Sequence, residues 1–255
     1  MHRSRAYLKL PFSFDLKRLQ QDLARLETSE WIAHFNTRAY ESSWSCLPLR
    51  AIDGRIDHIT PLDEGHYQDT PLLGLCPYFR EVIDTFHCEK TSIRLMSLAP
   101  GGVIKPHRDA HAALEDGLTR LHIPIQTTPD VLFHLEGEPV HFTAGDAWYL
   151  NASCLHGVTN GSSQPRIHLM MDCMTNDWLE QVFRASGWEP RPAHKYSDPA
   201  ITDDNVFTII AQLRSLGSET SLRLAASLEA IRTGAATPDG VSAASVPLQG
   251  NPYAE

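Results

Sequence analysis

The stretch "TRLHIPIQTTPDVLFHLEGEPVHFTAGDAWYLN", residues 119–151, decides the fold. Short apolar and aromatic runs in it are separated by "TTPD", "EGEP" and "TAGD", at intervals of roughly ten residues. The same texture extends from Ile93 to Cys173, where "PGG" and "TNGSSQP" mark further turns. Short strands joined by regularly spaced turns are typical of an antiparallel sandwich or barrel, so this segment predicts a mainly β core.

Helical patterns flank this core. Leucines recur at three- and four-residue spacing in 14–27, and 77–87 has a similar pattern. Two further helices are expected within 205–234, ended by Gly217 and Gly234. We expect three regions: a β domain with an N-terminal helical and mixed segment over 1–178, a small helical cap over 179–233 that closes over the site, and a flexible tail over 234–255.

Composition restricts the partners. A chain of 255 residues that is 42% hydrophobic can bury one sizeable core and a small appendage. A formal charge of −9 without a long basic run argues against nucleic acid and anionic membranes as partners. No apolar stretch reaches bilayer length and the start lacks a leader pattern, so we expect a cytoplasmic protein with a small-molecule or peptide partner. The five cysteines form no CxxC pair, which predicts reduced thiols. The sequence predicts no oligomeric state.

A candidate metal site begins at "PHRDAHAAL", residues 106–114. Residues i and i+2 of a strand point to the same side, so His107 and Asp109 can reach one ion if this stretch is extended. Pro106 favours an extended residue before it. One more histidine would complete the two-histidine, one-carboxylate triad that holds ferrous iron with open positions.

Spacing alone leaves alternatives open. The same His-x-acid spacing occurs at two other places, His87/Glu89 and His134/Glu136. The first lies in a predicted helix, where residues two apart diverge, and the second runs into the tight "EGEP" turn. His111, two residues after Asp109, is an alternative ligand, and we expect it to lie in the following loop.

Two predicted strands each carry an arginine and a histidine on one face. In "RIHLMMDC", Arg166 and His168 alternate with Ile167 and Leu169, and "TRLHIPI" places Arg120 and His122 together in the same way. An arginine inside a barrel requires an anion, and its planar guanidinium suits a carboxylate. If both arginines point inward, they predict a dicarboxylate ligand; if these faces are solvated, they predict none.

With these motifs the chain resembles the aspartyl/asparaginyl β-hydroxylase-like group of iron(II)- and 2-oxoglutarate-dependent oxygenases, which includes bacterial proline cis-hydroxylases. The resemblance extends from about Trp31 to Trp178. Its motifs are "WIAHFNTRAYESSW", "APGGVIKPHRD", "TRLHIPI", "GDAWYLN", "LHGVTN" and "RIHLMMDC". The resemblance implies a double-stranded β-helix (jelly-roll, cupin-like) core.

The resemblance also implies residue roles. The implied iron ligands are His107, Asp109 and His156. Arg166, ten positions after His156, is the implied partner of the distal carboxylate of 2-oxoglutarate. Arg120 and His122 match positions that contact the other carboxylate of the cosubstrate, although in the proline hydroxylases a nearby arginine serves the substrate instead. His168 is a further substrate-site candidate because it shares a face with Arg166.

The activity implied is hydroxylation of a C–H bond in an amino acid or an aspartyl/asparaginyl-type residue, with release of succinate and CO2. The implied cofactors are Fe(2+), 2-oxoglutarate and O2, with ascorbate as a supporting reductant. Animal aspartyl hydroxylases have glycine where Asp109 stands, so their protein substrate does not transfer directly, and Asp109 argues against a halogenase. The alternatives are a cupin-like metal enzyme or isomerase that does not use 2-oxoglutarate, and a non-catalytic binding barrel. Arg166 favours the oxygenase, because neither alternative requires a buried cation there.

Overall fold

The computed structural model of the protein describes residues 6–60, 65–109, 112–189, 195–196, 198 and 200–235. The chain divides into two compact units, Met1–Pro190 and Arg191–Glu255, and each is described by itself. The first unit includes α4 (Asp177–Ala185), most of which the sequence placed in the cap. The capping role of the C-terminal region stays a prediction, and residues 236–255 of the expected tail lie outside the described residues.

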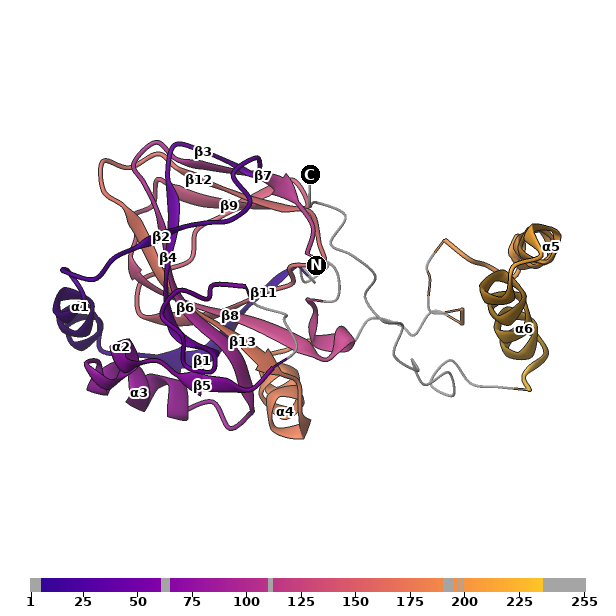
Figure 1. Ribbon diagram of the computed structural model, residues 1–255, viewed down its shortest axis with the longest axis horizontal. Helices are drawn as coiled ribbons and strands as arrows, with labels where there is room; N and C mark the ends of the chain where they lie inside the picture. The colour runs from indigo at the N-terminus through magenta and orange to yellow at the C-terminus, as the bar shows by residue number, and fades with distance from the viewer. Residues whose placement is uncertain are drawn as a thin grey trace. The chain divides into compact units, whose positions relative to one another are not determined.

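The first unit is built from two antiparallel sheets (Figure 1). Its strands are β1 (Tyr7–Ser13), β2 (Ile32–Ala33), β3 (Tyr40–Glu41), β4 (Trp44–Ile52), β5 (Tyr67–Asp69), β6 (Lys90–Leu98), β7 (Val103–His107), β8 (Leu118–Gln126), β9 (Val131–Leu135), β10 (Glu138–Val140), β11 (Asp146–Leu150), β12 (His156–Asn160) and β13 (Arg166–Met174). The larger sheet has the order β1-β11-β8-β13-β6-β4-β2, with β5 beside β4, and the smaller has the order β10-β9-β12-β7-β3.

From β6 to β13 the chain passes back and forth between the two sheets. Strands β6, β8, β11 and β13 lie in the larger sheet, whereas β7, β9, β10 and β12 lie in the smaller one. Four strands, β11-β8-β13-β6, thus face four others, β10-β9-β12-β7 (Figure 1). This arrangement is a double-stranded β-helix, so the predicted fold is confirmed.

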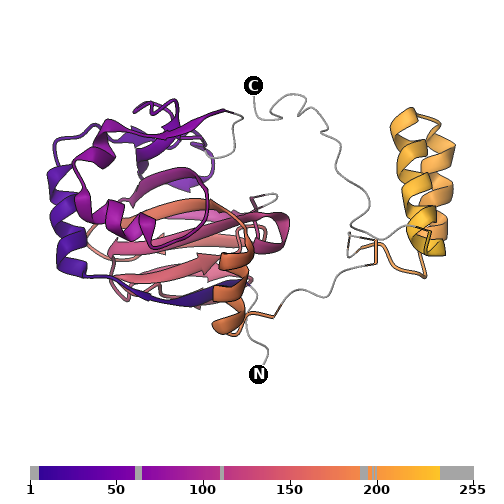
Figure 2. The ribbon, with the colours of Figure 1, turned by 90° about the horizontal axis from the view of Figure 1, so that it is seen from below.

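The outer face of the larger sheet is apolar and covered by helices. Leu121, Ile123 and Ile125 of β8 belong to the largest hydrophobic core, together with residues of the helices. The covering helices are α1 (Leu16–Arg25), α2 (Pro71–Gly74), α3 (Pro77–Asp84) and α4. Figure 2 shows α2, α3 and α4 in front of this sheet, and α1 at its side. The helices predicted in 14–27 and 77–87 are confirmed as α1 and α3.

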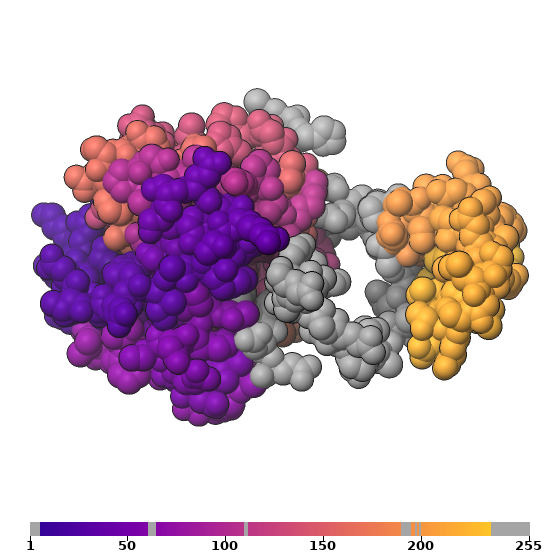
Figure 3. Space-filling view, turned by 45° about the horizontal axis from the view of Figure 1, so that its top comes forward, coloured from indigo at the N-terminus to yellow at the C-terminus, as the bar shows by residue number. Residues whose placement is uncertain are grey.

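The helices α1 and α3 are joined by one buried carboxylate. Asp22 of α1 accepts hydrogen bonds from the backbone N–H groups of Tyr78 and Phe79, at 2.7 and 2.9 Å. These N–H groups begin α3 and have no partner inside that helix, so Asp22 satisfies them and its charge favours the helix N-terminus. In Figure 3 the residues before β6, in indigo and purple, form much of the visible surface of this unit.

The inner face of the larger sheet is mixed. Phe133, Phe142 and Trp148 form a stack between the sheets, with ring centroids 4.2 and 4.8 Å apart. Polar side chains alternate with the outer-face residues along the same strands and point into this interior. They are Arg94, Arg120, His122, Arg166, His168 and Asp172. A mixed interior of this kind positions a ligand site inside the barrel.

The second unit contains the two predicted C-terminal helices, α5 (Val206–Leu216) and α6 (Glu219–Thr233). They pack on a small apolar core of their own. Gly217 and Gly234 end them in the left-handed conformation, with φ of 67° and 74°, which confirms both predicted ends. Within the described residues, no helix has the length and apolar content needed to traverse a bilayer.

Candidate metal and cosubstrate site

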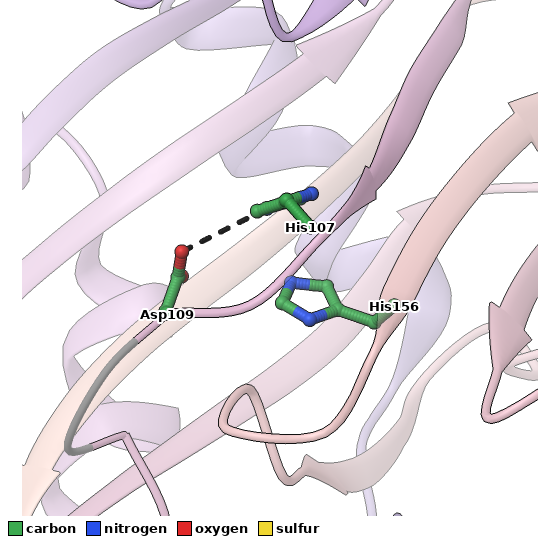
Figure 4. A group of neighbouring side chains, drawn as sticks. All are labelled: His107, Asp109 and His156. Atoms are coloured by element: carbon green, nitrogen blue, oxygen red, sulfur yellow. Dashed lines mark ion pairs between the residues drawn. The ribbon is translucent and has the colours of Figure 1, made fainter.

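Three predicted ligands meet where β7 and β12 pair. His107 at the end of β7 stands opposite His156 at the start of β12, and their ring centroids are 4.1 Å apart. Asp109 lies two residues past β7, where its N–H donates to the Ala152 carbonyl oxygen at 2.8 Å. One ligand atom from each of the three side chains lies within 4.8 Å of the other two (Figure 4). Among the described residues, this is the one such cluster of metal-ligating side chains.

A glycine lets the two strands approach each other at this point. Gly157 follows His156, and a Cβ added to it would lie 2.9 Å from the Ile104 carbonyl oxygen. That distance is shorter than ordinary carbon–oxygen contact, so any larger residue would push β12 away from β7. The separation of the two histidines therefore depends on glycine at this position.

The hydrogen bonds of the histidines leave the same nitrogen of each ring free. Nδ1 of His107 lies 2.8 Å from the Lys105 carbonyl oxygen, and Nδ1 of His156 lies 3.0 Å from that of Cys154. Because a carbonyl oxygen only accepts, both Nδ1 atoms carry the hydrogen, and both Nε2 atoms keep a lone pair. Histidines oriented in this way are typical metal ligands, so the donor set fits a divalent ion.

Charges in the cluster favour the ligating forms. Burial lowers the pKa of His156 to about 4, and His107 acts in the same direction, so this imidazole is neutral at pH 7. Burial acts to raise the pKa of Asp109, but Arg120 with His156 and His107 brings it below its ordinary value. The carboxylate is therefore ionised, and an anion with two neutral imidazoles suits ferrous iron.

The other candidate histidines lie elsewhere or outside the described residues. His134 contacts Thr159, with 3.1 Å between Nε2 and the hydroxyl oxygen. His87 was expected inside a helix, but α3 ends at Asp84 and the His87 ring instead packs near Trp178, with centroids 5.0 Å apart. His111 lies outside the described residues. Neither His87 nor His134 joins the cluster.

Arg166 is a buried cation without a carboxylate partner among the described residues. Its side chain is 2% exposed, and burial lowers its pKa to about 9, so it remains charged at pH 7. Its Nη2 donates to Nδ1 of His168 at 3.0 Å, and its guanidinium lies 5.0 Å from the ring centroid of Phe133. Its Nε is buried with no hydrogen-bond partner. An unpaired buried charge is costly, so this geometry suits an anionic ligand.

Two histidines beside Arg166 are also incompletely satisfied. His168 accepts from Arg166 at Nδ1, so its hydrogen is on Nε2, which is buried without a partner. Neither ring nitrogen of His122 has a partner, although the residue is 4% exposed. Burial and the Arg166 charge lower the pKa of both histidines well below 6.5. Both are therefore neutral groups that can still bind a polar ligand.

Arg120 differs from Arg166 because protein carboxylates surround it. Its Nε donates to Oδ1 of Asp172 at 2.7 Å, and its Nη1 donates to Oδ2 of Asp109. Asp172 is fully buried and accepts a second arginine, Arg94, whose Nη2 lies 2.8 Å from Oδ2. The anion that the sequence led us to expect beside Arg120 is thus supplied by the protein. A contact of Arg120 with cosubstrate or substrate stays a prediction.

The sequence reasoning missed Asp172 and Arg94. Asp172 shares the inward face of β13 with Arg166 and His168, and Arg94 lies on β6 beside it. The alternation that identified Arg166 and His168 reaches Asp172 when it is extended to the end of the strand. The pairing of these two residues required the sheet order, because β6 and β13 are far apart in the sequence.

The chain was compared with known protein families once this geometry was established. A model of the aspartyl/asparaginyl β-hydroxylase family matches residues 13–176. The chain belongs to this family. The resemblance inferred from the motifs is therefore confirmed, and the His-Asp-His cluster and Arg166 both lie inside the matched segment.

Two curated proteins are similar to this aspartyl/asparaginyl β-hydroxylase family member. L-proline cis-4-hydroxylase of Rhizobium meliloti (strain 1021) is 29% identical over 174 residues, which cover 67% of this chain and 61% of that protein. L-proline cis-3-hydroxylase 1 of a Streptomyces species is 27% identical over 175 residues, which cover 66% and 60%. The chain therefore spans less than two thirds of the length of these relatives. A solved Pseudomonas putida prolyl-4-hydroxylase aligns with 67% of this chain and 93% of its own, at 12% identity and a TM-score of 0.44.

Proposed function

We propose that the protein is an iron(II)- and 2-oxoglutarate-dependent dioxygenase that hydroxylates a C–H bond of an amino acid, with release of succinate and CO2. One observation carries the proposal: the barrel that holds the His107, Asp109 and His156 cluster also holds Arg166, a buried cation with no carboxylate partner among the described residues. A metal site alone suits many cupin-like enzymes. A metal together with an unpaired guanidinium suits a cosubstrate that carries two carboxylates.

The three ligands hold the metal through Nε2 of each histidine and a carboxylate oxygen of Asp109. Ferrous iron, when bound, supplies the chemistry by which oxygen and a 2-oxo acid oxidise a C–H bond. The residues of the chain orient the participants. The backbone carbonyls of Lys105 and Cys154 fix the two rings, and Arg120 holds the carboxylate oxygen of Asp109 on the other side.

Arg166 binds the distal carboxylate of 2-oxoglutarate in this proposal. His168 keeps the guanidinium in place by accepting one of its hydrogens, and its own Nε2–H remains free to donate. His122, with both nitrogens unpartnered, contacts the cosubstrate or the substrate. The aromatic stack of Phe133, Phe142 and Trp148 between the sheets limits water in this interior, which strengthens each of these polar contacts.

The substrate is a small amino acid in this proposal, with L-proline as the first candidate. Both relatives described above are named L-proline cis-hydroxylases, and they match the segment that contains the site. An aspartyl or asparaginyl residue of a peptide is the second candidate, because the family is named for that reaction.

The test is a screen of the purified protein with iron(II), ascorbate and 2-oxoglutarate. We expect succinate to form and one amino acid to gain a single oxygen atom by mass spectrometry. Free amino acids, L-proline first, are compared with short peptides that contain aspartate or asparagine. Asp109→Ala is the control that removes a ligand. If iron-loaded wild type forms no succinate from 2-oxoglutarate with any of these substrates, the proposed function is wrong.

A further inference from the structure

A chain of four buried charges connects the metal cluster to the far end of β13. Arg94 and Arg120 both donate to Asp172, one to each carboxylate oxygen, at 2.8 and 2.7 Å. Arg120 also donates to Oδ2 of Asp109. The order is therefore Arg94, Asp172, Arg120, Asp109, with alternating sign. The exposed fractions of Arg94, Asp172 and Arg120 are 2%, 0% and 6%.

The geometry divides the two oxygens of Asp109 between two partners. Oδ1 lies 3.7 Å from Nε2 of His107, on the side of the metal cluster (Figure 4). Oδ2 is held by Nη1 of Arg120. A carboxylate held at one oxygen presents the other in a fixed direction, and Asp109 needs this help because it lies beyond the end of β7.

Asp172 in turn determines where Arg120 is held. Its Oδ1 accepts from Nε of Arg120, so the guanidinium is fixed at one edge while Nη1 reaches Asp109. We infer that Asp172 is a positioning residue for the metal ligand Asp109, acting through Arg120. This inference rests on the proposed metal site and adds to it a residue that contacts neither metal nor substrate.

Charge balance gives the direction of the expected effect. The four groups carry two positive and two negative charges, which leaves Asp109 available to a cation. Replacement of Asp172 by asparagine removes one negative charge and leaves Arg94 and Arg120 facing a single carboxylate. Arg120 then competes with the metal for Asp109, and the net positive charge repels a divalent ion.

The test measures binding of Co²⁺ alone, by visible absorption, without 2-oxoglutarate or substrate. For Asp172→Asn we expect affinity about 10- to 100-fold below wild type, the range typical of groups that orient a metal ligand. Arg94→Gln is the matched control, because it breaks the other ion pair of the same buried carboxylate. It removes a positive charge, so Co²⁺ affinity should be equal to wild type or higher.

A double-mutant cycle tests whether the effect passes through Arg120. In an Arg120→Gln background, Asp172→Asn should change Co²⁺ affinity by less than about twofold, because the link is already broken. If Asp172→Asn does not fold, Arg120→Lys tests the same link, since lysine keeps the charge but cannot span two carboxylates with a planar fork. We then expect a comparable loss of Co²⁺ affinity.

Several results would overturn the positioning role. They are wild-type Co²⁺ affinity in Asp172→Asn, equal losses in Asp172→Asn and Arg94→Gln that follow their thermal stability, an undiminished effect in the Arg120→Gln background, and wild-type affinity in Arg120→Lys. Failure of the proposed function is distinguishable. If wild type itself does not bind Co²⁺, the metal site is wrong and the positioning role with it, whereas wild-type binding without succinate formation refutes only the activity.

Discussion

Arg120 and Arg166 occupy equivalent places on neighbouring strands, yet their surroundings are opposite. Both point into the barrel from the larger sheet, on β8 and β13, and their exposed fractions are 6% and 2%. Arg120 contacts two carboxylates of the protein, Asp172 and Asp109. Arg166 contacts a neutral histidine and the face of a phenylalanine ring.

The difference separates a cation that stabilises the fold from one that suits a ligand. Burial of a guanidinium is unfavourable unless an anion accompanies it. At Arg120 the protein supplies that anion, and the ion pairs belong to the folded state. At Arg166 the described residues supply none, so the missing anion is expected to come from a bound molecule.

The largest expected effect breaks the comparison at the level of stability. Arg120→Met should lower the free energy of unfolding by about 3–5 kcal/mol, because it removes one partner from buried ion pairs. Arg166→Met should change it by no more than about 1.5 kcal/mol, since only the hydrogen bond to His168 is lost. Urea unfolding without metal or cosubstrate measures both. Equal losses in the two variants would show that Arg166 has a structural partner as well.

The next effect concerns ligand binding. With Mn²⁺ in place of iron, 2-oxoglutarate at a hundred times its Kd should stabilise wild type by about 2.7 kcal/mol. Arg166→Met should lose most of this stabilisation, because truncation of one partner of a buried charged pair costs about 2–5 kcal/mol of binding. Thermal unfolding measures the difference.

Two controls make that measurement specific for the distal carboxylate. Pyruvate, a 2-oxo acid without this group, should stabilise wild type and Arg166→Met alike. Arg18→Gln, which breaks an exposed ion pair with Glu81, should respond to 2-oxoglutarate as wild type does. A full response in Arg166→Met would assign the distal carboxylate to another residue.

The smallest expected effect is on the pH dependence of stability. Burial and the charge of Arg166 hold the pKa of His168 well below 6.5 in the folded state, whereas the unfolded chain protonates near 6.5. The unfolded state therefore binds more protons below pH 6.5, so this stability is fully present above that pH and is lost as pH falls. His168→Gln does not titrate, and its amide oxygen can still accept from Arg166.

The stability of His168→Gln should thus fall less steeply between pH 6.5 and 5, by up to about 1.4 kcal/mol per pH unit. Urea unfolding of the metal-free protein at several pH values gives the two slopes. Identical slopes in wild type and His168→Gln would mean that His168 is not kept neutral by the fold.

Much of the fold could be predicted from local patterns. The regular turns of 93–173 indicated the β core, and helical spacing indicated α1, α3, α5 and α6. The alternation in β8 and β13 also separated the apolar outer face from the polar inner face. The helical expectation at His87 was wrong because α3 ends at Asp84, and periodicity does not fix where a short helix ends.

The sequence by itself determined which chemical groups are available: a His-x-Asp pair, a later histidine, and arginines in alternation with apolar residues. Only the tertiary structure decided which of these groups meet. The pairing of β7 with β12 brings His107 to His156, and the order β8-β13-β6 brings Arg120 and Arg94 to Asp172. The physical reason is that an ion pair depends on the distance between side chains, which sheet order and register fix, whereas a sequence pattern fixes only the face of the strand from which each side chain points.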